Sequence, residues 1–405
     1  MINADNTVKF WISPALYGVV AFLPFSIAFS EMCILITLLG VLAHIAITHS
    51  FGEFKSSLLY AVAAYILISL ASALLCKINP KSLNEVGHML LYIFLFASIY
   101  LGRKGIFTKG HLYVLIAALA FGALNGIVQY FNDTGILGRR APHNPGIPPR
   151  IRGTFSNSMT YSGFYGMALF FLMPLLKTRI RWLKMFVAAA VLLLLAAVVL
   201  SYARGALLAT IVTSFVLVVR QRKYLLHFLG AVVVIAIVSY FLLPELVSRM
   251  QYAFSGDAGF STYKLRLLYA EAAWDFFTVN PFFGIGPGAF TAAYEIWKPS
   301  ADFLPAAHAH NEYLEALSTR GIFGLLAFLT ILAVILRKLG SSIRKLGENE
   351  AHPLVRGTFY GLLFLCIASL FECHFADEEI FNFFSLVVGL GLGLSGKALA
   401  EFDSA

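Results

Sequence analysis

The sequence predicts an all-helical protein that crosses a membrane many times, and three observations support this fold class. Hydrophobic residues make up 59% of the 405 positions, charged residues make up only 13%, and the mean hydropathy is +0.80. A soluble domain has about 25% charged residues, so this chain carries about half the usual charge. Apolar runs of 16–22 residues recur along the chain, each long enough to cross a hydrocarbon layer about 30 Å thick.

The same composition excludes a soluble enzyme, a secreted disulfide scaffold and a nucleic-acid binder. In a membrane protein, a net charge of +9 indicates basic cytoplasmic loops and attraction to anionic lipid head groups, not to nucleic acid. The four cysteines lie in or at the ends of apolar runs, and their spacing fits neither a zinc site nor a redox motif. The expected surroundings are therefore a lipid bilayer.

Twelve apolar segments are predicted to be transmembrane helices, because lipid offers no hydrogen-bond partner to an unpaired backbone group. In chain order they are about 14–29, 32–48, 58–77, 86–101, 112–131, 159–176, 183–200, 205–219, 225–243, 320–336, 354–375 and 379–399. The chain then divides into nine transmembrane helices in 1–243, a loop at 244–319, and three further helices with a cytoplasmic tail in 320–405.

Positive charge predicts the orientation of this bundle. Twelve spans place both termini on one side, and with the N-terminus inside, 18 of the 30 basic residues fall on that side, nearly all in short loops. The positive-inside rule therefore puts the termini in the cytoplasm. The two long loops, 132–158 and 244–319, then lie outside, which is the periplasm if the membrane is a bacterial inner membrane.

The loop 244–319 has helical patterning of its own. Apolar residues recur at helical spacing over Tyr263–Val279, which ends at an Asn-Pro pair. A short helix is expected at 289–297. Pro305 begins a new segment, and 308–319 is expected to be helical up to the tenth span. Because the loop is amphipathic, we expect it to lie along the membrane surface and to cover a cavity.

Arginines on the outer side indicate an anion site. Arg204 lies at the outer end of the eighth span, where an arginine at membrane depth costs about 3 kcal/mol unless it snorkels to the interface or faces a cavity. Arg266 lies on the predicted loop helix, where a solvated face is the alternative, and Arg152 ends a basic cluster in the first long loop. Guanidinium groups bind phosphate in bidentate fashion, so together these residues fit a lipid-linked phosphate or pyrophosphate.

His308 and His310 form a second candidate group, followed directly by Asn311. If Pro305 precedes the helix start, His310 lies in the first turn, where the positive end of the helix dipole favours the neutral imidazole that a general base needs. The alternative is a histidine that makes only interfacial contacts. Metal binding by the pair is not expected, because residues two apart diverge on a helix and no third ligand follows at a suitable spacing.

Acidic residues gather at the outer end of the eleventh span: Glu372, Asp377, Glu378 and Glu379. They are expected to pair with the outer arginines or to stay solvated, and the sequence leaves their role and that of His308 open. The chain has no Asp-x-Asp motif, no Walker motif and no Gly-x-Ser-x-Gly elbow. We therefore expect no metal and no other cofactor.

Several motifs together resemble the superfamily of O-antigen ligases and O-antigen polymerases. His310-Asn311, nine residues, and then Gly321-x-x-Gly324 resembles its signature H-N-x9-G-x-x-G. The stretch from Asn280 to Phe290 is similar to the N-P-x-x-G-x-G-x-G-x-F stretch that is frequent there. Arg204 and Arg266 fall in elements similar to two arginine motifs of the family. The resemblance is motif-specific over about 200–325.

This resemblance implies a GT-C-like glycosyltransferase fold in the inner membrane, with the active site facing the periplasm. The implied donor is a glycan on undecaprenyl pyrophosphate, and the implied acceptor is lipid A–core. By the resemblance, His310 deprotonates the acceptor hydroxyl, with Asn311 supporting it, while Arg204, Arg266 and more distantly Arg152 hold the pyrophosphate. Because such a donor arrives activated, one base without a metal suffices, and attack from the opposite face inverts the anomeric carbon.

The length of 405 residues, the absence of an added C-terminal domain and the His-Ala-His-Asn-Glu context favour a ligase. An O-antigen polymerase and a protein O-oligosaccharyltransferase share the motif and remain alternatives. A lipid or polysaccharide transporter is a further alternative from another class. It would place ionisable residues near the bilayer midplane in broken helices, whereas the basic residues here lie at the outer ends of the spans.

Overall fold

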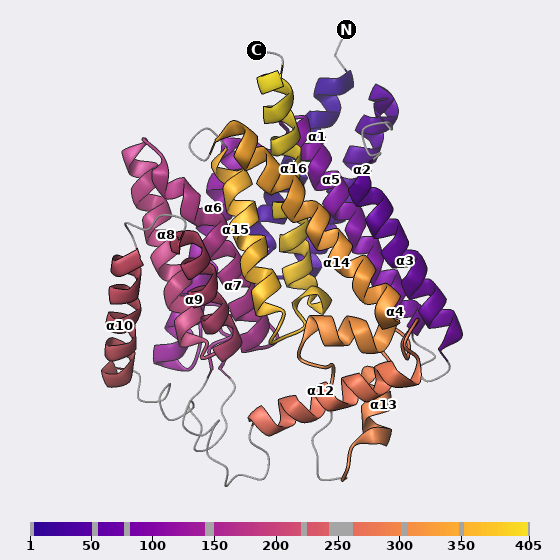
Figure 1. Ribbon diagram of the computed structural model, residues 1–405. Coiled ribbons are helices and arrows are strands. Elements are labelled where there is room, and N and C mark those ends of the chain that lie inside the picture. Colours follow the sequence, from indigo (N-terminus) through magenta and orange to yellow (C-terminus); the bar gives the residue numbers. More distant parts are fainter. Residues whose placement is uncertain are drawn as a thin grey trace.

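The computed structural model of the protein describes residues 4–50, 56–76, 82–141, 150–219, 225–242, 262–300, 306–347 and 352–403. Apart from one isolated bridge between Thr134 and Arg140, the regular elements of these residues are all helices. The long helices form one bundle (Figure 1). Both chain termini lie at one end of this bundle, and two short helices, α12 and α13, lie across the opposite end. The predicted all-helical fold is confirmed.

Twelve of the described helices overlap predicted spans, although their bounds differ. They are α1 (Ala4–Phe22), α2 (Ile27–Thr48), α3 (Ser57–Leu75), α5 (Tyr92–Arg103, preceded by α4, Ser82–His88, and the 3-10 turn η2, Met89–Leu91), α6 (Lys109–Asn132), α7 (Ser158–Leu172, extended by η3, Met173–Lys177), α8 (Arg181–Leu200), α9 (Arg204–Val219), α10 (Leu225–Leu242), α14 (Glu312–Leu346), α15 (Pro353–Ala368) and α16 (Glu378–Asp403).

Eight of these helical segments are long and apolar enough to cross a membrane, so the protein is a polytopic membrane protein. Three more apolar helices are shorter, namely the part of α1 from Lys9, α9 and α15. The remaining helix, α10, has 18 residues. The total of twelve crossings therefore stays a prediction, because four of the twelve helices fall outside the set of eight.

The predicted first span, 14–29, is wrong. α1 begins well before residue 14, contains Pro14 within its length and ends before Pro24. Ser26 then caps α2, its Oγ accepting a hydrogen bond from the Phe29 N–H. Pro24 has no N–H to continue a helix, and Ser26 is a favourable N-cap, so the chain turns where hydropathy alone shows one continuous segment.

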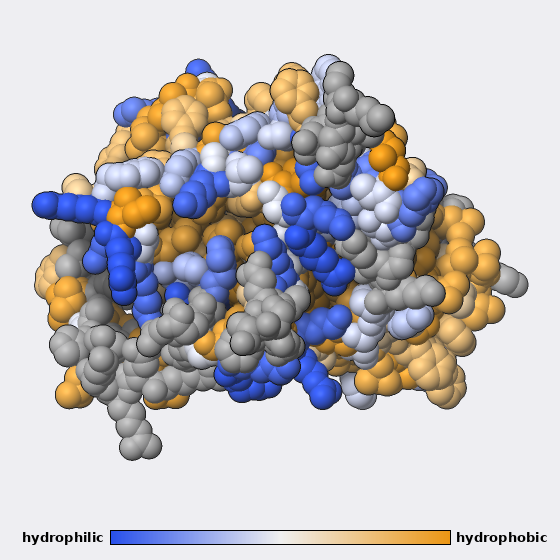
Figure 2. Space-filling view, turned by 90° about the horizontal axis from the view of Figure 1, so that it is seen from above, coloured by the Kyte–Doolittle hydropathy of each residue, from blue (hydrophilic) through white to orange (hydrophobic). Residues whose placement is uncertain are grey.

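α7 and α16 form the middle of the bundle, each with 83% of its membrane-length window buried. α16 packs closely against α5, where a Cβ at Gly389 or Gly393 would overlap the α5 backbone. Small residues allow this close approach of two helices. Seen from the end that carries the termini, hydrophilic side chains lie across the middle of the face and hydrophobic side chains form much of its outline (Figure 2).

The loop helices were predicted well, except at the last one. α12 (Thr262–Val279) and α13 (Phe290–Trp297) match the predicted segments. They share a small hydrophobic core of their own, which includes Tyr269, Phe276, Phe290 and Tyr294. The predicted helix over 308–319 instead begins at Glu312. The predicted segment start at Pro305 and the part of the loop up to residue 261 lie outside the described residues.

A glycine-rich turn fastens this loop to α14. The Ile285 and Gly286 N–H groups donate to the carbonyls of Ser318 and Thr319 at 3.0 and 2.9 Å, and the Ile322 N–H donates to the Pro281 carbonyl at 2.8 Å. α14 is kinked at Gly321, whose φ of 68° and ψ of −169° lie outside the helical region. The kink frees the carbonyls that the turn uses, so Gly321 links the extramembrane loop to the transmembrane part of α14.

We predict that Gly321→Ala destabilises the protein more than Gly347→Ala. Both glycines have positive φ with an extended ψ, a conformation that costs other residues about 1–3 kcal/mol. At Gly321 the new Cβ would also overlap the Phe282 backbone, whereas at Gly347 no atom of the described residues lies within 4 Å of it. Thermal unfolding in detergent measures the difference. Equal shifts in Tm for the two variants would show that the contact between Gly321 and Phe282 does not matter.

Candidate active site

Four side chains from three separate segments meet at the end of the bundle that α12 covers. The Nδ1 of His310 lies 2.9 and 3.0 Å from the two carboxylate oxygens of Glu372. The Nε2 of His308 lies 3.4 Å from Glu372 Oε1, and Arg266 Nη2 lies 3.9 Å from Oε2. The Glu372 side chain is only 9% exposed. A nearly buried carboxylate is thus shared by two histidines and an arginine, and we call these four residues the His310–Glu372 cluster.

His310 does not lie in the first turn of a helix, so that prediction is wrong. Its φ is +50°, and the following residue, Asn311, is the N-cap of α14. The Asn311 Oδ1 accepts hydrogen bonds from the Tyr313 and Leu314 N–H groups at 2.9 and 3.1 Å. Asparagine is among the best N-cap residues, and it fixes the start of the helix one residue after His310. The imidazole therefore lies in front of the helix, toward Glu372.

Backbone hydrogen bonds hold the start of α14 to the segment that follows α15. The Asn311 Nδ2 donates to the Leu370 carbonyl at 3.1 Å, and the Glu312 N–H donates to the Ser369 carbonyl at 2.9 Å. In return, the Phe375 N–H donates to the Glu312 carboxylate at 3.0 Å. These bonds bring together His310 and Glu372, which are 62 positions apart in the sequence. Asn311 therefore supports the site by positioning it.

α12 supplies two further contacts to the cluster. The ring of Tyr269 stacks on the His310 imidazole, with centroids 5.5 Å apart and planes 25° apart. The Arg266 guanidinium donates to the Phe371 carbonyl, next to Glu372. Because Arg266 and Tyr269 are three positions apart, they lie on the same face of α12. The loop helix thus both restricts the histidine ring and brings a cation to the carboxylate.

Burial and charge set the protonation states around the cluster. Burial opposes the charged form of Glu372, but the hydrogen bond and charge of His310, together with His308 and His374, lower the pKa of this carboxyl to about 2. Burial lowers the pKa of His308 to about 4 despite the attraction of Glu372. The buried His374 likewise has a pKa lowered to about 4 by desolvation. Near neutral pH, Glu372 is anionic and both of these histidines are uncharged.

This arrangement suits a general base. Glu372 can only accept a hydrogen bond, so a neutral His310 donates Nδ1–H to it. The lone pair then lies on Nε2, and the carboxylate holds the ring in this tautomer and stabilises the imidazolium that forms after proton uptake. The sequence did not identify Glu372 as the partner of His310. The signal was the acidic group beside Cys373 and His374, at the end of an apolar run.

The three predicted arginines differ in whether they contact the His310–Glu372 cluster. Arg266 is part of it. Arg204 is the first residue of α9, and a Cβ on the next residue, Gly205, would overlap Phe371. The start of α9 therefore packs on the residue that precedes Glu372. Arg152 instead donates to carbonyl groups of its own loop, those of Ser156 at 3.0 Å and Arg140 at 3.5 Å.

The acidic residues at the end of α15 also separate into different roles. The expectation that they pair with outer arginines or stay solvated misses the two histidines that contact Glu372. Asp377 accepts a hydrogen bond from Thr160 Oγ1 at 2.8 Å, and burial raises the pKa of this carboxyl to about 7. Glu378 lies 3.3 Å from His88 in a half-exposed pair. Among these acids, Glu372 is the one that contacts His310.

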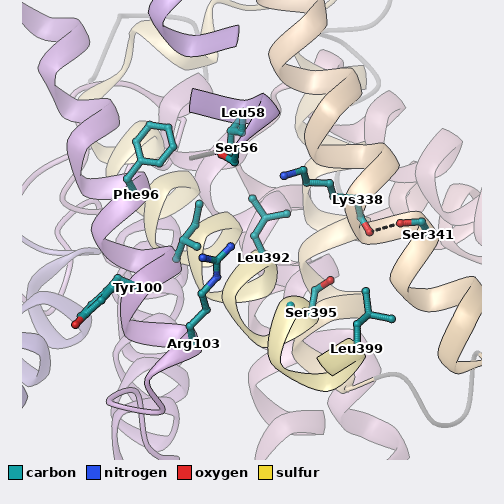
Figure 3. Close-up of a pocket in the computed structure, with 12 residues that line it drawn as sticks. Ser56, Leu58, Phe96, Tyr100, Arg103, Lys338, Ser341, Leu392, Ser395 and Leu399 are labelled. Atoms are coloured by element: carbon teal, nitrogen blue, oxygen red, sulfur yellow. Dashed lines mark hydrogen bonds between the residues drawn. The ribbon is translucent and has the colours of Figure 1, made fainter. Parts of the chain in front are cut away.

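A different cavity, of about 170 Å³, lies at the other end of the bundle, between α5, α14 and α16. The side chains of Arg103 and Lys338 point into it (Figure 3). Its walls are otherwise apolar or carry hydroxyl groups, and the residues that line it include neither histidine nor a carboxylate. The candidate active site is therefore the His310–Glu372 cluster and not this cavity.

The all-helical membrane bundle thus holds two histidines, a carboxylate and one arginine together at one end. Residues 189–329, which include Arg204, Arg266 and His310, match the family model described as O-antigen ligase (Wzy_C). This match confirms the resemblance and assigns this part of the chain to the O-antigen ligase and polymerase superfamily, whose enzymes transfer lipid-linked glycans. A comparison with curated proteins finds no match.

We predict that the contribution of His308 and His374 to stability falls as the pH drops from about 6.5 to about 4, while the buried Asp377, whose pKa is raised to about 7, contributes in the opposite direction. Burial holds the pKa values of His308 and His374 at about 4, below the ordinary value of 6.5. Between these values the unfolded chain takes up protons that the folded protein does not, so acid favours unfolding. Melting temperatures measured from pH 7 to pH 4 test this. His308→Gln should gain stability relative to the unaltered protein as the pH falls over this range, and an identical pH dependence in the two proteins would contradict the assignment.

Proposed function

We propose that the protein is an O-antigen ligase, which transfers O-antigen polysaccharide from undecaprenyl pyrophosphate to lipid A–core at the periplasmic face of a bacterial inner membrane. The observation that carries this proposal is the contact between Glu372 and His310, next to Arg266, because His310 and Arg266 both lie in the residues that match the family model. In this proposal the transfer is inverting and needs no metal, and His310 is the general base.

The proposed reaction is a single displacement. The His310 Nε2 accepts the proton of an acceptor hydroxyl as its oxygen attacks the anomeric carbon of the donor. The bond from this carbon to the pyrophosphate oxygen breaks on the opposite face, and undecaprenyl pyrophosphate leaves with the electron pair. Glu372 stabilises the imidazolium that forms, and such base catalysis contributes about 10²–10⁴-fold in rate.

Arginines supply the second part of the chemistry. The leaving pyrophosphate gains negative charge as the bond breaks, and preorganised guanidinium donors stabilise this charge without proton transfer. In this proposal Arg266, at the cluster, and Arg204, at the start of α9, act on the donor. Arg152, held in its own loop, is proposed only as a more distant contact.

The proposed orientation rests on charge and on the position of the cluster. The end of the bundle opposite the cluster carries both termini (Figure 1) and the cavity with Arg103 and Lys338. Arg103, Lys104 and Lys397 also line an adjoining pocket there. A basic end favours the cytoplasmic leaflet with its anionic lipids, which puts the His310–Glu372 cluster on the periplasmic side.

Reconstitution tests the proposed function. Purified protein in liposomes receives undecaprenyl-pyrophosphate glycan, lipid A–core and EDTA, and a gel then reports glycan attached to lipid A. Attachment is the expected result. Lengthening of the polyprenyl-linked chain would make the protein a polymerase, and glycan on a serine or threonine of an added protein would make it a protein glycosyltransferase. No transfer by folded protein with any acceptor would favour the transporter.

We predict that His310→Ala abolishes transfer but leaves donor binding nearly intact. Glu372→Gln should lower kcat by about 10²-fold or more, because a neutral amide no longer stabilises the imidazolium. Single-turnover assays with labelled donor measure both effects. Glu295→Gln is the matched control, since it removes a carboxylate from a surface pair with Lys298. Turnover retained in His310→Ala would exclude His310 as the base.

We predict that Arg266→Ala weakens donor binding and also lowers kcat, because Arg266 would contact the pyrophosphate in both the ground state and the transition state. Arg204→Ala should likewise weaken donor binding. The control is Lys264→Ala, which removes an exposed cation from the same helix. Binding of radiolabelled donor to the purified variants, followed by kcat measurements, tests this. Unchanged donor affinity in both arginine variants would contradict the proposed pyrophosphate contacts.

A further inference from the structure

The donor atoms of His308, His310 and Glu372 converge as the ligands of a metal ion do. One atom from each residue lies within 4.8 Å of the other two. Glu372 Oε1 is 2.9 Å from His310 Nδ1 and 3.4 Å from His308 Nε2. Ligands that bind zinc tetrahedrally at about 2.0–2.1 Å lie about 3.3 Å from each other, so the two spacings from Glu372 are close to those of a tetrahedral site.

This convergence contradicts the reason for expecting no metal. Residues two apart diverge on a helix, but both histidines precede α14 and lie in a tight turn. His310 has a φ of +50°, and the Ala309 N–H between the histidines donates to the Glu315 carboxylate at 2.9 Å. The turn places the two imidazoles with their centroids 4.4 Å apart. The third ligand, Glu372, follows α15 and is 62 positions from His310 in the sequence, so residue spacing gives no sign of it.

The ligand types indicate which metals fit. Two imidazoles and one carboxylate suit zinc, cobalt and similar divalent transition metals, whereas magnesium and calcium prefer oxygen ligands alone. Three protein ligands leave a fourth position open. The histidine side chains are 27% and 25% exposed, so that an ion can reach the cluster from outside.

Two features of the site weaken metal binding, so we expect the ion to bind reversibly and not permanently. Arg266 lies 3.9 Å from Glu372 Oε2, and its positive charge repels a cation at the neighbouring oxygen. The His308 Nδ1 accepts a hydrogen bond from the His310 N–H at 3.2 Å. Coordination through Nε2 moves the His308 proton to Nδ1, so this hydrogen bond is lost when the metal binds.

We propose that His308, His310 and Glu372 form a binding site for a divalent transition metal such as Zn²⁺, and that the bound ion inhibits transfer. Only the inhibitory part rests on the proposed function. When a metal occupies Nδ1 of His310, the remaining ring proton must stay on Nε2, which then has no lone pair for the acceptor hydroxyl. The ion also takes the carboxylate that stabilises the imidazolium. Metal binding and base catalysis therefore exclude each other.

Binding is tested first, without any activity. Purified protein is treated with EDTA, desalted and titrated with Co²⁺, whose visible d–d absorption reports a low-coordinate site with nitrogen ligands. The titration gives the Co²⁺ affinity. This affinity should fall at least about tenfold in each of three variants, His308→Gln, His310→Gln and Glu372→Gln. His88→Gln is the matched control, because it removes a histidine that pairs with another carboxylate, Glu378, outside the proposed site. The control should keep the full signal.

Inhibition is tested second, in the reconstituted transfer assay. Saturating Zn²⁺ should lower the rate of the unaltered protein at least about tenfold relative to EDTA, since it removes the base. Each variant is compared with its own rate in EDTA, and His308→Gln should lose most of the inhibition. Transfer absent in EDTA together with intact Co²⁺ absorption would overturn the proposed function and support the metal site.

Three results would overturn this inference. One is the absence of d–d absorption in protein whose melting curve shows that it is folded. Another is absorption that persists unchanged in both histidine variants, which would place the ion elsewhere. The third is a higher rate with Zn²⁺ than with EDTA, which would overturn inhibition and make the ion a Lewis acid for the acceptor.

Discussion

The candidate active site depends on the hydrogen bonds between the start of α14 and the segment that follows α15. The Asn311 amide, the Glu312 N–H and the Glu312 carboxylate each bond to the backbone of that segment. Without this contact the N–H and the carboxylate of the buried Glu312 would lose these partners, and unpaired buried polar groups cost about 1–3 kcal/mol each. The need to satisfy a helix terminus is thus what brings His310 to Glu372.

The carboxylate of Glu372 concentrates several interactions in one place. It is nearly buried, yet it stays charged because two imidazoles and a guanidinium surround it. A charge held in this way orients the histidine by its Nδ1, which is the arrangement of a base and its supporting carboxylate. The same donor set also fits a transition metal, because the requirements for orienting an imidazole and for ligating an ion overlap. Catalytic and inhibitory states then compete for the same lone pairs.

The loop that carries α12 and α13 also contacts the site. α12 and α13 share a small core of their own, and the glycine turn after α12 bonds to the kinked part of α14. Tyr269 and Arg266 therefore reach the cluster from a helix that is fixed to the same element as His310. Because the kink at Gly321 requires a positive φ, a single glycine determines how the loop meets the bundle. The superfamily signature spans both the histidine and this kink.

The sequence by itself determined the membrane class, nearly every helix, the loop helices and the superfamily, because hydropathy and short motifs are local properties of the chain. It also singled out His310 and the arginines as candidate site residues, but not where they lie. The break at Pro24 and the start of α14 at Glu312, after its N-cap Asn311, were decided by proline and by capping, which compete with periodicity over one or two residues. Only the tertiary structure decided that Glu372 is the partner of His310 and that His308 joins them. That contact joins residues 62 positions apart through backbone hydrogen bonds between two helix ends, and no pattern of neighbouring residues encodes it.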